Sequence, residues 1–186
     1  MNISEISAKA AIELSNTLRQ MDENSIEKLM DAICSSKKIF VAGAGRSLLM
    51  LRGLAMRLMQ IGYTSYVVGD TTTPAFEAED LLIIGSGSGE TAGLVNVATK
   101  AKKIGGKVAL ITIREESILA KLSDILIIIP AFTDMIDDAN MVKPILPGGT
   151  MFEQAMLFIG DTMVLPLAEK TNIPTNKAFS RHANLE

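Results

Sequence analysis

The chain of 186 residues is 48% apolar and carries a formal net charge of −3. This length and apolar content are enough for one sizeable hydrophobic core, so we expect one domain over residues 1–186. An acidic chain with no Trp and 4% aromatic residues lacks the basic face and the stacking rings of a nucleic-acid-binding protein.

The sequence also bears on where the protein is found. No apolar run reaches the ~18 residues that span a bilayer, and the opening MNISEISAKA lacks the charged start and apolar core of a signal peptide. The single cysteine, Cys34, cannot form an internal disulfide, which suits a reducing compartment. We therefore expect a cytoplasmic protein with no membrane partner. Cys34 ends a helical pattern and is expected to be a small buried side chain.

Two amphipathic helices are predicted at the start of the chain. In the first, apolar residues recur every four positions, at Ile6, Ala10, Leu14 and Leu18. A second helical pattern covers residues 26–33. Because the first stripe stands at a chain end and must be buried, we expect it to contribute to subunit contacts.

Short apolar runs then alternate with helical stretches. The runs, each predicted to be a strand, are KIFVAG, TSYVVG, DLLIIG, KVALIT and DILIIIP. Met56 and Met59 fall at core spacing between the first two runs and are expected to be packing residues. Because the strands are apolar without alternation, both faces of their sheet must be covered. The sequence therefore predicts an α/β fold, a five-stranded parallel sheet flanked by helices on both faces, of the flavodoxin-like type.

Three further segments complete this outline. Residues 71–74, TTTP, are predicted to start a helix with proline in its first position. Residues 130–149 are irregular and could form a lid or a subunit contact. A last helix is predicted over about residues 150–170, kinked or broken at Pro166.

Two turns rich in glycine and serine each follow a predicted strand and precede a predicted helix. They are VAGAGRSLL, residues 41–49, and IIGSGSGETAGL, residues 83–94. The first N–H groups of a helix lack partners and carry the positive end of the helix dipole, so they bind anions such as phosphate. Glycine lets the backbone approach the anion, and hydroxyls add donors. The candidate residues are Gly43, Gly45, Ser47, Gly85, Ser86, Gly87, Ser88, Gly89 and Thr91.

The order of the strands would decide whether the two turns meet. In a sheet of order 2-1-3-4-5, the first and third strands are neighbours and their carboxyl ends form the ligand crevice. Both turns would then hold one anion, and Arg46 at a helix start also favours an anion there. Plain turns capped by Ser and Thr, with Arg46 as a surface residue, are the alternative. A dinucleotide site is another, because Asp70 stands where a ribose-binding acid would, but neither turn has the third glycine of GxGxxG.

An enzyme also needs a group that moves a proton. Glu153 is the leading candidate because it opens a helix directly after a Gly-Gly turn. The spacing Thr150-x-x-Glu153 also fits a capping box, in which the carboxylate would accept from the Thr150 N–H. His182, the single histidine, stands in a polar tail. No His, Cys, Asp or Glu set has metal-ligand spacing, so we expect no metal or other cofactor, and acid–base chemistry on a phosphorylated small molecule.

Several motifs together are similar to one family. GAGRS, AMRLM, GDTTTP, GSGSGET, TMFEQ and the terminal RHANLE resemble the 6-phospho-3-hexuloisomerases of the sugar isomerase (SIS) fold, over nearly everything from about residue 26 onward. The resemblance implies interconversion of arabino-3-hexulose 6-phosphate and fructose 6-phosphate through a cis-enediolate, without a metal. It also implies the ribulose monophosphate route of formaldehyde fixation and a homotetramer with sites near subunit contacts.

The resemblance also assigns residues to roles. By position, Glu153 would be the base and His182 an acid. Leu48 departs from the family, which usually has glycine there. Another sugar-phosphate isomerase of the same fold, such as an arabinose 5-phosphate isomerase, and a non-catalytic sugar-phosphate sensor are the alternatives. The residues expected at the substrate are Ser47, Ser86, Ser88 and Thr91 for the phosphate, with Gly45, Arg46, Gly87 and Gly89 beside them.

Overall fold

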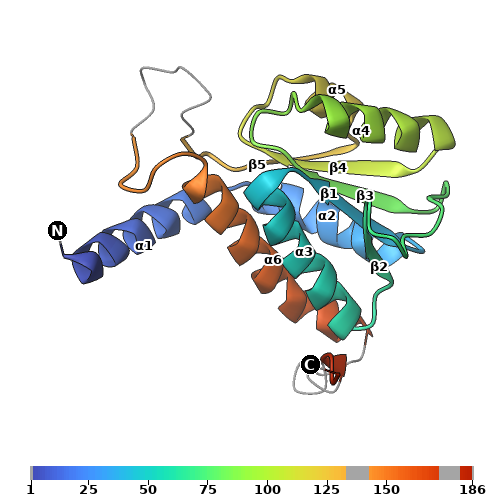
Figure 1. Cartoon of the computed structure of the whole chain (residues 1–186), viewed down its shortest axis with the longest axis horizontal. Helices are drawn as coiled ribbons and strands as arrows, with labels where there is room; N and C mark the ends of the chain where they lie inside the picture. The colour runs from blue at the N-terminus through green and yellow to red at the C-terminus, as the bar shows by residue number, and fades with distance from the viewer. Residues whose placement is uncertain (1, 133–142, 172–180, 186) are drawn as a thin grey trace.

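The structure is a computed structural model that describes residues 2–132, 143–171 and 181–185. A five-stranded sheet lies between two layers of helices (Figure 1). In chain order the elements are α1 (Ile3–Arg19), α2 (Glu23–Ser35), β1 (Ile39–Gly43), α3 (Gly45–Gln60), β2 (Ser65–Val67), β3 (Leu81–Gly85), α4 (Ala92–Ile104), β4 (Lys107–Thr112), α5 (Ile118–Leu122), β5 (Ile125–Ile128) and α6 (Thr150–Thr171).

The strands follow the order β2-β1-β3-β4-β5, and every neighbouring pair is parallel. The predicted α/β fold and its five strands are confirmed. β1 and β3 are neighbours, with Gly43 opposite Gly85 at their carboxyl ends. The helices that follow these two strands pack on opposite faces of the sheet, so the winding reverses between them. The carboxyl ends of β1 and β3 therefore form the ligand crevice that the predicted strand order requires.

Two hydrophobic cores join the layers. One face of the sheet packs against α1, α2, α3 and α6, and its core contains the buried Ile39, Leu58 and Ile83. The other face packs against α4 and α5 around Phe40 and Leu82. Successive residues of a strand point to opposite faces, so Ile39 and Phe40 enter different cores. This is why the strand runs are apolar at every position.

The two opening helices are confirmed. The Asp22 side chain accepts hydrogen bonds from the N–H groups of Asn24 and Ser25 and so starts α2. α1 extends away from the sheet (Figure 1), and of its predicted stripe only Ala10 and Leu14 are buried. The remaining apolar surface of α1 is available for contacts outside this chain.

Two backbone predictions, a helix start at residues 71–74 and a break of the last helix at Pro166, differ from the structure. Residues 71–74 form a turn and an extended segment instead of a helix start. The Thr73 hydroxyl donates to the Val67 carbonyl at 2.6 Å, which holds the chain in this turn after β2. α6 continues through Pro166 to Thr171 without a break.

Three burial predictions are wrong. Cys34 is exposed, because it lies beside the buried stripe of α2 and not within it. Its thiol is 3.3 Å from the Tyr63 hydroxyl, and burial together with this contact raises the pKa of Tyr63. Met56 and Met59 are 44% and 40% exposed, because they lie outside the buried face of α3 and line an open hollow beside β2.

One ion pair ties α4 to the sheet. The Asp124 carboxylate accepts hydrogen bonds from Lys102 Nζ in α4 and, at 2.8 Å, from the N–H of Val108 in β4. Burial raises the pKa of Asp124, but the two hydrogen bonds outweigh that effect and hold it below its ordinary value. The ionised carboxylate is therefore the form that stabilises the fold.

Among the described residues, one helix, α6, is long and apolar enough to cross a membrane by length and composition. Of the most apolar 18-residue stretch of this helix, 50% is buried inside the protein. α6 packs against α3 and contributes Phe152, Met156 and Met163 to the larger core. A position in the core accounts for its composition.

Candidate active site

A cavity of about 440 Å³ opens at the carboxyl ends of β1 and β3. Both glycine- and serine-rich turns line it, and the start of α6 closes one side. All of the predicted substrate-site residues except Gly43, Gly89 and His182 are among its walls. The lining residues are Ala44, Gly45, Arg46, Ser47, Gly85, Ser86, Gly87, Ser88, Thr91, Leu94, Ile113, Gly148, Gly149, Phe152 and Glu153.

The first turn leads directly into α3. Gly45, the first residue of the helix, has a φ of +55°, a left-handed conformation that favours glycine. A Cβ on Gly43 would lie 3.0 Å from the Leu48 Cα, so the strand end and the helix are in close contact. Leu48 is accommodated within this turn, and Ser47 remains at the cavity wall.

The second turn is held together by its own hydroxyls. Ser86 Oγ accepts a hydrogen bond from the Gly89 N–H at 3.2 Å and lies 3.3 Å from Thr91 Oγ1. Gly89 has a φ of +66°, and a Cβ there would lie 2.1 Å from the Ser117 hydroxyl. Gly89 is buried and supports the turn from outside the cavity. Its described contacts are therefore structural.

Two of the helices that begin at the cavity, α3 and α4, lack the side-chain caps found at other helices of this protein. α1, α2 and α5 each begin with a side chain that accepts a backbone hydrogen bond. Ala44 and Thr91, the N-cap residues of α3 and α4, make no such bond. In α4 the Leu94 N–H donates to the Thr91 carbonyl at 2.9 Å. No cap side chain takes up the N–H groups before it or those at the start of α3, so these are left for a ligand, and both dipoles direct positive charge toward it. This is the arrangement of an anion site, and it argues against turns that are merely capped.

Glu153 lies in the first turn of α6 and faces Arg46 across the cavity. Its side chain is only 12% exposed, and one carboxylate oxygen accepts a hydrogen bond from Arg46 Nε. Among the hydrogen bonds of the described residues, none joins this carboxylate to the Thr150 N–H. The capping box weighed as an alternative therefore does not form in this structure.

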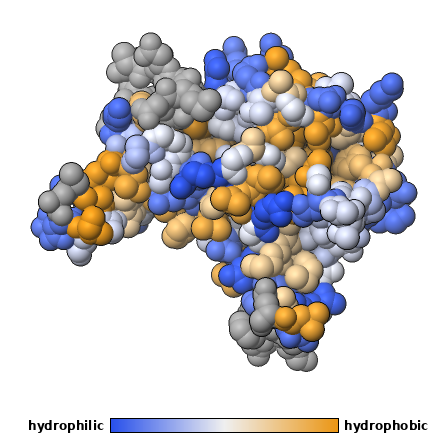
Figure 2. All heavy atoms as spheres, in the orientation of Figure 1, coloured by the Kyte–Doolittle hydropathy of each residue, from blue (hydrophilic) through white to orange (hydrophobic). Residues whose placement is uncertain are grey.

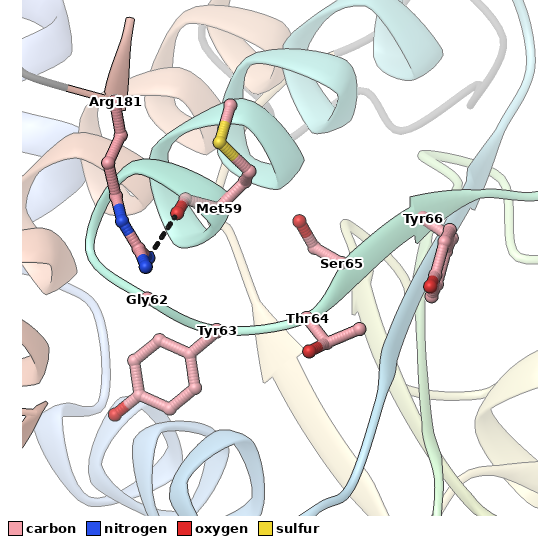
Figure 3. Close-up of a pocket in the computed structure, with 7 residues that line it drawn as sticks. All are labelled: Met59, Gly62, Tyr63, Thr64, Ser65, Tyr66 and Arg181. Carbon is pink, nitrogen blue, oxygen red and sulfur yellow. Dashed lines mark hydrogen bonds between the residues drawn. The ribbon is translucent and has the colours of Figure 1, made fainter.

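His182 does not reach this cavity within its own chain. It is exposed, and its Nδ1 lies 3.0 Å from the Ala183 carbonyl. The neighbouring Arg181 donates to the carbonyl of Met59 near the C-terminal end of α3, beside a second cavity of about 450 Å³ (Figure 3). Ser47 lies at the other end of α3, which is about 24 Å long at 1.5 Å per residue.

Two apolar walls of the cavity come from remote segments that no motif in the sequence indicated. Phe152 and Ile113 line the cavity beside Gly87, with carbons 3.6 and 3.5 Å from the position of a Cβ there. The only sequence signals for these walls are that Phe152 precedes Glu153 and that Ile113 follows the end of β4. Glu90, the acidic residue of the second turn, accepts a hydrogen bond from the N–H of Ile118, the first residue of α5. Among the described residues, no three His, Cys, Asp or Glu side chains form a metal-binding group.

A family model, that of the SIS domain, matches residues 32–156. The chain belongs to the SIS domain family. The match includes β1, β3, both turns and Glu153, which are the parts of the fold that form the cavity. His182 lies beyond it.

Relatives within the family extend the likeness over the whole chain. The 3-hexulose-6-phosphate isomerase of Bacillus subtilis is 42% identical over 100% of both chains. The enzyme of that name from Mycobacterium gastri is 40% identical over 94% of this chain and 86% of its own. A solved structure from Methanococcus jannaschii, for which the molecular function of 3-hexulose-6-phosphate isomerase was inferred, is 35% identical, covers 93% of this chain and 97% of its own, and has a TM-score of 0.80.

Proposed function

We propose that this protein is an isomerase that interconverts arabino-3-hexulose 6-phosphate and fructose 6-phosphate through a cis-enediolate. The observation that carries the proposal is the cavity in which two uncapped helix N-termini face a carboxylate on a third helix. The relatives named 3-hexulose-6-phosphate isomerase support the choice of sugar.

The phosphate end of the substrate lies between the two turns in this proposal. The chain has a net charge of −3, so local donors must hold a dianion. Ser47, Ser86, Ser88 and Thr91 supply hydroxyls, and the first turns of α3 and α4 supply N–H groups. Hydrogen bonds to a charged acceptor contribute about 1.5–3 kcal/mol each, so a few of them are enough to bind a sugar phosphate.

Glu153 is the proton-transfer group in the proposed mechanism. Its carboxylate takes the C2 proton of the 3-ketose, and the electron pair of that C–H bond forms a C2=C3 double bond as charge moves to the C3 oxygen. The carboxyl group, whose proton exchanges with solvent, then protonates C3, and the C2 hydroxyl proton passes to the C3 oxygen, which leaves a carbonyl at C2. N–H groups of the glycine turns stabilise the enediolate oxygens, and Phe152 limits the access of water.

His182 serves the site of a neighbouring subunit in this proposal. Fructose 6-phosphate closes to a furanose and must be opened before its C3 proton can be removed, which is a task for an acid. Because His182 lies at the far end of α3 from the cavity of its own chain, a second copy must bring it there. A second copy is the least that this requires, and we propose the homotetramer that the family resemblance implies, with a mass in solution near four times 20.0 kDa.

Apolar surface supports such an assembly. α3 and α6, which both begin at the cavity, expose several large apolar side chains: Leu49, Met56, Leu157, Phe158 and Leu165. Hydrophobic atoms are visible on α1 and across the middle of this face, where α3 and α6 lie (Figures 1 and 2). Burying this surface against a second copy would remove it from water. Light scattering that gives the mass of a monomer at micromolar concentration would contradict this part of the proposal.

The catalytic proposal is tested by incubating the pure protein with fructose 6-phosphate and, separately, arabinose 5-phosphate in deuterated water with a chelator. Proton NMR should show loss of the C3 proton signal of fructose 6-phosphate and formation of the 3-ketose. Arabinose 5-phosphate should stay unchanged. If the protein converts arabinose 5-phosphate but not fructose 6-phosphate, it is an arabinose 5-phosphate isomerase instead. A positive result is consistent with a cytoplasmic enzyme of the ribulose monophosphate route of formaldehyde fixation, which is the setting we propose for it.

A further inference from the structure

Arg46 occupies an electrostatically unusual position. It lies in the first turn of α3, where the positive end of the helix dipole disfavours a cation. The Glu153 carboxylate compensates, because Arg46 Nε donates to it directly. The two side chains differ in freedom, since that of Arg46 is 61% exposed and that of Glu153 only 12%. Arg46 is therefore the partner that can move.

The pair also lies in the phosphate site. Ser47 follows Arg46 in the chain, and both residues line the same cavity as Ser86, Ser88 and Glu153. A sugar phosphate brings about −1.5 to −2 charges into this space. A guanidinium carries five N–H donors in a planar fork, and this fork matches a phosphate in two parallel hydrogen bonds. The phosphate and Glu153 are therefore two anions that compete for one cation.

The competition bears on catalysis. A carboxylate oxygen that accepts a hydrogen bond from a guanidinium is occupied by that proton and is a poorer acceptor for a proton from carbon. When the guanidinium turns to the phosphate, that oxygen of Glu153 becomes free while the sugar is in place. A free sugar would not produce this change, because it brings no anion.

We propose that Arg46 is a positioning residue that responds to the substrate's phosphate, holding Glu153 in the empty site and releasing it when the phosphate binds. This inference rests on the proposed role of Glu153 as the base. It adds a source of specificity, since the phosphate would then increase the rate of proton transfer as well as the affinity.

The first test observes the pair without any reaction. The Arg46 Nε–H resonance, assigned by its loss in Arg46→Lys, and the carboxyl carbon of Glu153, assigned by its loss in Glu153→Gln, are followed as inorganic phosphate is added. Both resonances should shift with one shared midpoint, and chloride at equal ionic strength should leave them in place. Shifts confined to the amides of the two turns would overturn the proposal.

The second test separates the phosphate from the sugar. Wild-type protein is given fructose, which has no phosphate, and exchange of its C3 proton with deuterated water is measured with and without phosphite dianion. Phosphite should accelerate the exchange at least about tenfold, the range of one charge-assisted hydrogen bond. Arg46→Gln should reduce this activation to less than about twofold, and Arg46→Lys should restore part of it.

Arg52→Gln is the matched control. Arg52 lies on the same helix and pairs with Asp70 at 2.6 Å, but it is not among the residues that line this cavity. It should keep the full activation by phosphite. If Arg46→Gln also keeps it, or if phosphite has no effect on a wild-type protein that isomerises fructose 6-phosphate, Arg46 is not such a residue and the proposed function still stands. Phosphate-dependent shifts of both resonances in a protein that does not act on fructose 6-phosphate would leave the Arg46 response intact and refute the proposed function.

Discussion

Replacing Glu153 by Gln tests the proposed base with little change in shape. The amide keeps an oxygen that can accept from Arg46 Nε, but it cannot take a proton from carbon. The lost ion pair involves a side chain that is 61% exposed, so it should contribute no more than about 1 kcal/mol to stability. For a chain of 186 residues this is a decrease in Tm of about 2–4 °C.

The catalytic effect should be much larger. General-base catalysis contributes about 10²–10⁴-fold, so Glu153→Gln should lower kcat by at least about 10². Calorimetry measures the Tm, and proton NMR in deuterated water measures both turnover of fructose 6-phosphate and exchange of its C3 proton. Both rates should fall together, because abstraction of the C3 proton is the first step in this direction. Binding of fructose 6-phosphate should persist, since the phosphate donors are unchanged.

Asp161→Asn is the control for this experiment. Asp161 lies two turns further along α6, pairs with Arg57 at 3.1 Å and is 48% exposed. This variant also loses one exposed ion pair on α6, but it should keep normal turnover. A Glu153→Gln protein with near-normal turnover and exchange would refute the assignment of Glu153 as the base.

Three further predictions concern the second turn and the fold. Ser88→Ala should raise KM about 10- to 100-fold with little change in kcat, because phosphate is bound equally in the ground and transition states; steady-state kinetics showing the reverse would place Ser88 in the chemistry. Gly89→Ala should cost at least about 2 kcal/mol in denaturant unfolding, since its Cβ would lie 2.1 Å from a buried serine hydroxyl, whereas Gly93→Ala, with no atom within 4 Å of its Cβ, should be neutral or stabilising. Asp124→Asn should lower stability at pH 7 by less than about 1 kcal/mol, because the carboxylate is 38% exposed. Since the pKa of Asp124 is held below its ordinary value, the difference from wild type should shrink as the pH falls below about 4, and a difference that grows in acid would contradict the stated sign.

Local sequence was enough to predict most of the elements. The apolar runs at β1 and β3 predicted buried strands because burial on both faces demands an apolar residue at every position. The glycine- and serine-rich turns after them predicted an anion site, because backbone approach and helix N-termini are local properties. The strand order was predicted only as a condition, and the structure confirms it.

Tertiary structure decided what the side chains do. Glu153 and Arg46 are 107 positions apart, and no periodicity indicates that one would pair with the other. From spacing alone Glu153 also fitted a helix cap, and its orientation toward Arg46 depends on how α6 packs against α3. Cys34 and Met56 were predicted to be buried and are exposed, because a helical stripe shows that a face is apolar but not which part of it another element covers. Contacts between segments far apart in the chain follow from packing and chain topology, and these are properties of the whole fold that no short stretch of residues contains.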